Sequence, residues 1–379
     1  MLKNKITLLF LLIFVLSNSF CFGQMPLAKT TKVSILTCEK GNELYSLFGH
    51  TAIRIKDDAN ALDVVYNYGT FDFNTENFYL KFVKGDLRYF VTAYNYNEFF
   101  YEYTLENRSI YEQSLNLTDA QKQLLFDTLN KSLQSDEKYY TYKFIDRNCT
   151  NMVVDKVNQT LGEKCIVKTT EKDLSYRQIL YPYLKNHFYE NLGINIIFGQ
   201  KTDEKGEKLF LPNQFMESLK VAKYKGISIS ETPRTILKAT PSESKTPFWN
   251  NIYSFSLLLL LIVLIRKSWA YLLFFGILGL VGVFLSLVGF YSFHEEVTKN
   301  YNVLLFNPIL LLLIVYYWRK NFVWVKRIAQ FIIVLLMVYV IILLNKPNLV
   351  MFMPIIISTI LMLFYFLRKS NKNLLTSVK

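Results

Sequence analysis

The sequence has few of the side chains that enzymes use most often for nucleophilic or metal chemistry. Its 379 residues include four cysteines and three histidines. The histidines lie far apart and no Cys-x-x-Cys pair occurs, so no set of metal ligands with a recognisable spacing is present. A Gly-rich phosphate-binding loop is also missing. We therefore expect neither a metal nor a nucleotide cofactor.

Acidic side chains are nearly absent from the last third of the chain, where Glu295 and Glu296 are the only two after residue 247. The same region is rich in long apolar runs, which are Phe248–Ile265, Trp269–Phe290, Tyr301–Trp318, Ile328–Leu344 and Leu349–Leu367. Each run is near the roughly 20 residues that cross a hydrocarbon core. We predict an all-α membrane domain of five transmembrane helices over residues 248–379.

The N-terminus has the layout of a secretory signal. Lys3 and Lys5 precede an apolar run, and Cys21 and Gly23 suit the positions before a cleavage site. Residues 1–23 are thus predicted as a signal peptide and residues 24–227 as an exported domain. Residues 228–247 are rich in Pro, Ser and Thr, which is typical of a linker.

Positive charge is distributed unevenly between the loops of the apolar region. Residues 266–267, 319–327 and the tail from 368 hold ten Lys or Arg and no acid, whereas 291–300 and 345–348 hold two Lys and two Glu. The positive-inside rule then predicts a multi-pass protein of the cytoplasmic (inner) membrane, with the N-terminal domain in the periplasm and the C-terminus in the cytoplasm. Most of the net charge of +13 is explained as a topology signal, so nucleic-acid binding is not expected.

The exported domain is predicted to be α+β, with strands grouped in its first half. Alternating apolar and β-branched residues predict strands over 32–38, 50–55, 61–69, 87–96 and 108–115. Short helices are expected over 42–48 and 75–85. Thr118 followed by Gln121 is a capping-box signature for a helix that runs to about Lys131.

Cys149 is the candidate nucleophile. Without the signal the chain keeps Cys38, Cys149 and Cys165, so one thiol stays free even if a Cys38–Cys165 bridge forms. Asn148 is a good helix cap, and Cys149 would then begin the helix, with Arg147 adjacent. The positive end of a helix and a nearby cation both favour the thiolate. Cys149 also ends the apolar face of this helix, so a buried, inert cysteine is the alternative.

A cysteine nucleophile needs a base. His187 lies at the end of a predicted helix and is interpreted as structural. His50 begins a predicted strand and points to its less apolar face, where a polar site could form. A third group would orient the imidazole. The next strand and the turn after it offer four candidates, which are Tyr66, Asn67, Tyr68 and Asp72.

Polar residues also gather between two apolar runs. His294, the two glutamates and three asparagines, among them Asn302, fall within fourteen residues. Polar groups at membrane depth are costly unless they are partnered or functional. We hypothesise that His294 and Asn302 lie near the membrane-facing mouth of the Cys149 site and help to bind substrate, together with Arg147 and Asn148. A solvated loop without such a role is the alternative.

These motifs resemble known proteins. A strand that starts with His, HTAIRI, and a later helix that starts with Cys, RNCTNMVVD, are similar to circularly permuted papain-like (NlpC/P60-related) proteins, which include lecithin:retinol acyltransferase. More closely, LFGHTAIRI, VVYNYGTFDF, NLT and RNCTNMVVD resemble the exported domain of Lnb-type bacterial lipoprotein N-acyltransferases. The resemblance implies a permuted papain-like fold in which Cys149 carries an acyl group as a thioester and His50 acts as base.

The function implied by the resemblance is acyl transfer at a membrane. The donor would be a membrane phospholipid or the lipid of a lipoprotein, and the acceptor would be the N-terminal amine of a lipoprotein. Two alternatives are a membrane-tethered periplasmic cysteine peptidase or amidase and a non-enzymatic envelope protein. A peptidase would not need so many membrane spans, whereas both substrates of the acyltransferase are held in the membrane.

Overall fold

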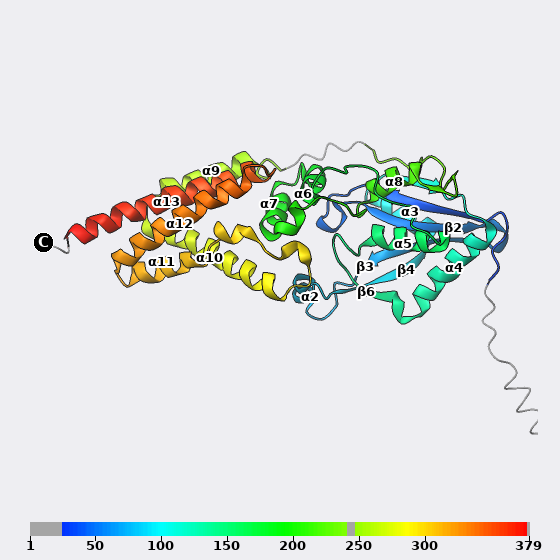
Figure 1. The fold of residues 1–379 in the computed structure, drawn as a ribbon, viewed down its shortest axis with the longest axis horizontal. Coiled ribbons are helices and arrows are strands. Elements are labelled where there is room, and N and C mark those ends of the chain that lie inside the picture. The colour runs from blue at the N-terminus through cyan, green and yellow to red at the C-terminus, as the bar shows by residue number, and fades with distance from the viewer. Residues whose placement is uncertain (1–24, 241–246, 377–379) are drawn as a thin grey trace, which may run out of the picture.

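The computed structural model describes residues 25–240 and 247–376 (Figure 1). The predicted signal peptide, residues 1–23, lies outside the described residues. The chain forms an α+β part at one end and a long helical part at the other, with the C-terminus at the end of the helical part that is far from the sheet.

A seven-stranded sheet forms the centre of the α+β part. Its strand order is β6-β4-β3-β2-β1-β5-β9, and every pair is antiparallel. The strands are β1 (Lys32–Cys38), β2 (His50–Asp57), β3 (Leu62–Thr70), β4 (Arg88–Asn95), β5 (Ile110–Ser114), β6 (Tyr139–Thr141) and β9 (Arg234–Leu237). A separate hairpin pairs β7 (Lys223–Tyr224) with β8 (Ile227–Ser228). The predicted α+β class is confirmed, and the five predicted strands correspond to β1 to β5.

Each face of the sheet is covered by its own helices, because side chains alternate between the faces along a strand. On one face, Ile35, Ile53 and Tyr66 belong to a core that includes residues of α4 (Asp119–Gln134) and α5 (Cys149–Leu161). On the other face, Leu36 and Ala52 pack with residues of α3 (Tyr96–Leu105). Packing against the sheet therefore fixes the position of α5, whose first residue is Cys149.

Local signals explain most of the remaining elements. The Thr118–Gln121 capping box is present and begins α4. The helix predicted over 75–85 is α2 (Phe78–Lys84), and the one predicted over 42–48 is a single 3₁₀ turn at Leu44–Ser46. The second half adds α6 (Tyr176–Leu180), α7 (Phe188–Ile197) and α8 (Pro212–Val221). Strand β9 lies inside the range predicted as a linker.

The helical part has four candidate membrane spans, so the prediction of five was wrong. The spans are Ser268–Tyr291, Glu295–Trp318, Phe322–Leu343 and Leu349–Leu375, and they contain α10 (Ser268–Tyr291), α11 (Ile309–Trp318), α12 (Phe322–Leu343) and α13 (Leu349–Thr376). The first apolar run forms only α9 (Ile252–Leu264), because Asn251 caps it late and the chain turns at Arg266. Its 13 residues reach about 20 Å, short of the roughly 30 Å of a hydrocarbon core.

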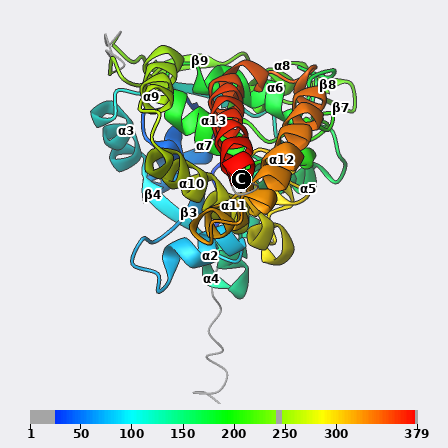
Figure 2. The ribbon, with the colours of Figure 1, turned by 90° about the vertical axis from the view of Figure 1, so that its left-hand side faces the viewer.

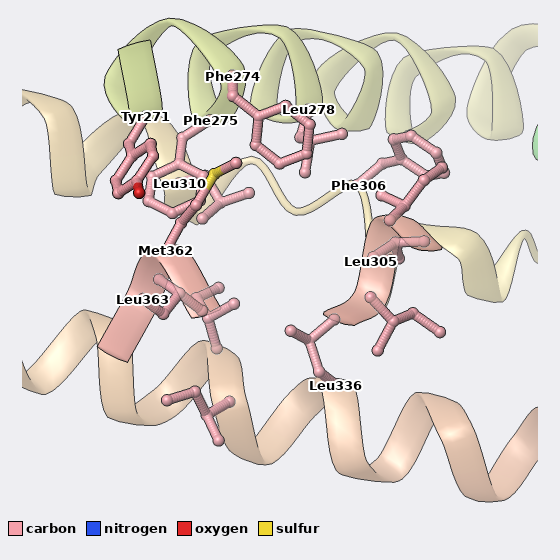
Figure 3. Packing of buried hydrophobic residues seen from close by; sticks show 14 of the residues in the cluster. Tyr271, Phe274, Phe275, Leu278, Leu305, Phe306, Leu310, Leu336, Met362 and Leu363 are labelled. Atoms are coloured by element: carbon pink, nitrogen blue, oxygen red, sulfur yellow. The ribbon is translucent and has the colours of Figure 1, made fainter. Parts of the chain in front are cut away.

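The spans pack through apolar side chains that include Phe275, Leu310, Leu336 and Met362 (Figure 3). Glycine permits the closest approach, since a Cβ at Gly282 would lie 1.8 Å from the carbonyl oxygen of Phe306. Small residues at such contacts let membrane helices come together.

The segments that were predicted to face the cytoplasm meet at the end of the bundle that is far from the sheet (Figure 1). Lys369 Nζ donates to Ser268 Oγ at 2.7 Å and to Tyr317 Oη at 2.6 Å. These contacts tie the start of α10, the end of α11 and the last turns of α13. The basic residues of 266–267, 319–327 and the tail thus lie between these helices or near those helix ends.

Buried charges join the α+β part to the spans. Arg177 of α6 is 3% exposed, and its Nε donates to Asp203 Oδ1 at 2.6 Å. Asp203 Oδ2 also accepts from Lys346 Nζ at 2.6 Å and from the hydroxyl of Tyr301 at 2.8 Å. Burial alone would raise the pKa of Asp203, but Arg177 and these donors outweigh it and lower that pKa. We call Arg177, Asp203, Tyr301 and Lys346 the joint.

Replacement of Arg177 by Met is expected to destabilise the protein. The change leaves the Asp203 carboxylate with one cation fewer and leaves Asn195 Oδ1 without its 2.6 Å donor. Loss of one partner of a buried pair costs about 3 kcal/mol. Thermal unfolding of the full-length protein in detergent measures the effect. The matched control is Lys205→Met, which removes an exposed pair with Asp173; an equal shift for both variants would contradict the role of the joint.

Candidate active site

The start of α5 holds Cys149 in place through a reciprocal cap. Asn148 Oδ1 accepts from the N–H groups of Thr150 at 2.9 Å and Asn151 at 3.1 Å. In return, the Asn148 N–H donates to Asn151 Oδ1 at 3.0 Å. The prediction that Asn148 caps and Cys149 begins the helix is confirmed.

The sheet register places His50 and Asn67 beside each other. His50 begins β2, and β3 pairs with β2 so that Asn67 lies opposite Ala52, on the same face as His50. His50 Nε2 and Asn67 Oδ1 are 2.9 Å apart. An amide oxygen only accepts, so Nε2 carries a proton and Nδ1 is the nitrogen left to interact with Cys149, which is electrostatically coupled to His50.

The electrostatics of Cys149 and His50 favour a charged pair. Burial alone would raise the pKa of Cys149, but the His50 charge and hydrogen bonds from His50, the Thr51 backbone and Thr150 outweigh it and lower that pKa. Burial alone would lower the pKa of His50, but Cys149 and Asn67 outweigh it and raise that pKa. Both shifts stabilise a thiolate beside an imidazolium.

The other two described cysteines, Cys38 and Cys165, have raised rather than lowered pKa values. All three are free, so Cys38 and Cys165 do not form a bridge. Burial raises the pKa of the Cys38 thiol to about 12 and that of the Cys165 thiol to about 11. Thiolate character therefore belongs to Cys149 among the cysteines of residues 25–240 and 247–376.

Two contacts near Cys149 were not predicted from the sequence. Thr51 Oγ1 and Thr150 Oγ1 are 3.1 Å apart and tie β2 to α5 beside the cysteine. Gly69 has a φ of +96°, and a Cβ there would lie 3.5 Å from Cys149 Cβ. A glycine inside a strand is the signal that could have indicated such a close approach, whereas nothing in the sequence singles out the two threonines.

Asn67 is the one of the four proposed third residues that bonds to His50. Tyr68 points to the opposite face of β3, where it is buried with Tyr140, and burial raises the pKa of Tyr68 to about 12. Tyr66 shares that face, and its hydroxyl donates to Asn130. Asp72 is exposed beyond β3, and its carboxylate accepts from the N–H of Asn74.

The substrate-binding candidates at the helix start differ in accessibility. Arg147 is exposed, with its guanidinium 5.3 Å from the centre of the Tyr140 ring. Asn148 is buried, and its Nδ2 donates to the carbonyl oxygens of Phe144 and Phe210 at 2.8 Å each. With its Oδ1 in the cap, the Asn148 amide is fully engaged within the protein.

The structure brings the loop of His294 onto the α+β part. One of its contacts there is with Ile145, four residues before Cys149. His294 Nε2 lies 3.0 Å from the carbonyl oxygen of Phe82, and burial lowers the pKa of His294. The neighbouring Glu296 is buried, and its Oε1 accepts from the N–H of Ile145 at 3.0 Å. The loop therefore contacts the segment that leads into Cys149.

Asn302 contacts a different element, the end of α7. Its Nδ2 donates to the carbonyl oxygens of Asn195 at 2.7 Å and Ile196 at 2.9 Å. Its Oδ1 accepts from the hydroxyl of Tyr339 at 2.8 Å. All of these partners are protein groups, so Asn302 joins α7 to the bundle.

Replacement of His50 by Gln is expected to slow alkylation of Cys149 at neutral pH, since the thiolate and not the thiol reacts. The His50 charge lowers the pKa of Cys149, so its loss moves the alkylation profile to higher pH. Iodoacetamide labelling of a Cys165→Ser protein across pH measures this, and His187→Gln is the control. Profiles that coincide for the His50 and His187 variants would contradict the pairing.

No three His, Cys, Asp or Glu side chains of the described ranges lie together in a way that could hold a metal ion.

No curated protein and no solved structure matches the chain. Residues 19–180 match the family model described as the Lnb N-terminal periplasmic domain. This range contains His50, Asn67 and Cys149 and excludes all the candidate spans. The chain therefore carries an Lnb N-terminal periplasmic domain, followed by an apolar helical region with four candidate membrane spans.

Proposed function

We propose that this protein is a membrane acyltransferase that moves an acyl chain through Cys149 to the N-terminal amine of lipoproteins. The observation that carries the proposal is the Cys149–His50–Asn67 arrangement within an Lnb periplasmic domain, since Lnb proteins are lipoprotein N-acyltransferases. The donor is a membrane phospholipid or the lipid of a lipoprotein. Both substrates reside in the membrane, to which the domain is held by its own spans.

The first half of the reaction forms a thioester. The Cys149 thiolate attacks the ester carbonyl carbon of the donor, a C–S bond forms and the ester C–O bond breaks. The departing alkoxide takes a proton from the His50 imidazolium and leaves as an alcohol. Asn67 accepts from Nε2 throughout, so it keeps Nδ1 directed at the sulfur.

The second half transfers the acyl group to an amine. The amine nitrogen attacks the thioester carbonyl carbon, a C–N bond forms and the C–S bond breaks. The surplus proton of the amine passes to His50, which restores the imidazolium and the thiolate. No water is consumed, so exclusion of water from the thioester decides between transfer and hydrolysis.

The start of α5 has fewer free N–H groups for an oxyanion than an uncapped helix N-terminus would have. The N–H groups of Thr150 and Asn151 already donate to Asn148, and that of Met152 donates to the Asn148 carbonyl oxygen. The N–H of Cys149 has no acceptor among the described residues. It is the donor that we assign to the developing oxyanion.

Two further features support the proposal. The His strand precedes the Cys helix, which is the order of circularly permuted papain-like proteins, and we propose that fold relationship for the domain. The basic segments end on the side of the bundle far from the sheet (Figure 1). This supports a protein of the inner membrane with its catalytic domain in the periplasm and its C-terminus in the cytoplasm.

The proposal predicts a hydroxylamine-sensitive acyl adduct on Cys149 when the full-length protein is incubated with phospholipid vesicles. Mass spectrometry of the intact protein and its peptides measures the adduct. Cys149→Ala removes it, and His50→Gln slows its formation by about 10²-fold or more, as loss of a positioned acid–base group does. Cys165→Ser is the control and keeps the adduct. Cleavage of peptide bonds without any adduct would instead indicate a cysteine peptidase.

A further inference from the structure

An apolar surface surrounds α2 at the edge of the Lnb domain. Tyr79 is 75% exposed and Leu80 is 69% exposed, and both lie on this short helix. The exposed fractions are also large for Phe73, in the turn before α2, and for Phe82. We call these four residues the α2 surface. A contiguous exposed apolar surface of this kind marks a binding site for a protein, a ligand or a membrane.

The end of a membrane span is attached to α2. The N–H of Phe293 donates to the carbonyl oxygen of Lys84 at 2.7 Å, and Ser292 Oγ donates to that of Val83 at 2.9 Å. Gly85 makes this contact possible, since a Cβ there would lie 2.9 Å from His294 Cδ2. The span ends at Tyr291, so α2 lies at the level of the membrane surface, beside the bundle (Figure 2).

The residues around the contact have the composition of a membrane interface. Phe290 and Phe293 are exposed at the end of α10 and just after it. Lys81 and Lys84 lie in the last turn of α2. Apolar side chains that enter a bilayer, together with Lys near the phosphates, are the features of helices that lie in the interface. Continuity with the span therefore favours lipid over a protein as the partner of the α2 surface.

A strip of aromatic rings leads from α2 to the active site. Ring centres are 6.4 Å apart for Phe82 and Phe78, and 5.9 Å for Phe78 and Phe71. The strip continues from Phe71 to Tyr89 at 5.2 Å and from Tyr89 to Tyr142 at 4.3 Å. Phe71, Phe78, Tyr142 and Cys149 pack against one hydrophobic cluster. The rings of the strip and the Cys149 side chain thus adjoin the same apolar core.

We propose that the α2 surface inserts into the outer layer of the membrane and that the strip from Phe82 to Tyr142 receives the acyl chain of the donor lipid and directs its ester to Cys149. The second part rests on the proposed acyl transfer, whereas the insertion does not.

Insertion is tested by fluorescence quenching in proteoliposomes of the full-length protein. The protein carries Cys149→Ala and Cys165→Ser, with Leu80→Cys labelled by an environment-sensitive dye. Phospholipids with a nitroxide near the headgroup end of the chain are expected to quench this label. Ile227→Cys is the matched control, since Ile227 is 70% exposed in the β7–β8 hairpin, which follows α8 in the α+β part. Equal quenching at both positions, or none at either, would overturn insertion.

Entry of the acyl chain at α2, where the proposed path begins, is tested with Leu80→Glu in a protein that is otherwise unchanged. Leu80 would contact lipid in the proposed arrangement, so its loss together with the added charge is expected to slow adduct formation from vesicles by about tenfold. Alkylation of Cys149 by iodoacetamide stays as in wild type, because the pair with His50 is intact. Leu124→Glu is the control, since Leu124 is exposed on α4.

The outcomes separate this inference from the proposed function. If the wild type forms no adduct, acyl transfer fails and the acyl path fails with it, while the quenching result still decides insertion. If the wild type forms the adduct and Leu80→Glu forms it equally fast, acyl transfer stands and the acyl path is overturned. A slow adduct for Leu80→Glu with a normal rate for Leu124→Glu supports the path.

Discussion

The joint of Arg177, Asp203, Tyr301 and Lys346 is the constraint on which the rest of the structure depends. A buried ion pair adds little to stability, since desolvation offsets its attraction, but it accepts few alternative geometries. Here the pair that joins the α+β part to the spans is Asp203 with Lys346, and Arg177 holds Asp203 from the other side. Together with the hydrogen bonds of Tyr301 to Arg177 and Asp203, this contact fixes how the α+β part meets the candidate spans.

The active site depends on a second balance, between burial and pairing. Burial opposes both charges of the thiolate–imidazolium pair, and their proximity outweighs it together with hydrogen bonds from neighbouring groups. That proximity comes from the sheet: His50 and Asn67 are neighbours through register, and the Thr51–Thr150 contact holds α5 against the same strand. A slip of one residue between β2 and β3 would turn Asn67 to the opposite face. The register is thus a catalytic requirement of the proposed function.

Features that depend on neighbouring residues were predicted from the sequence, whereas contacts between residues far apart in the sequence were missed. The cap by Asn148 and the strand of His50 are local, and both are as predicted. The choice of Asn67 over Tyr68 needs the register of β3, which alternation alone does not supply. The short α9 follows from a cap at Asn251 within an apolar run that looked long enough to cross. Arg177 carried no signal, because its partners are far from it in sequence.

The polar cluster between the spans shows why a correct pattern can have a different cause. Its members were expected to contact substrate because polar groups at that depth need a reason. Asn302 donates hydrogen bonds to carbonyl oxygens at the end of α7. Glu296 accepts a hydrogen bond from the N–H of Ile145, in the segment before Cys149. His294 fits over Gly85 and fixes α2. Each therefore satisfies protein groups, and their clustering reflects the seam between an aqueous domain and a bilayer. The proposed acyl transfer needs such a seam to be rigid, because a displacement of a few ångströms would separate the Cys149 sulfur from the ester of a membrane-bound donor.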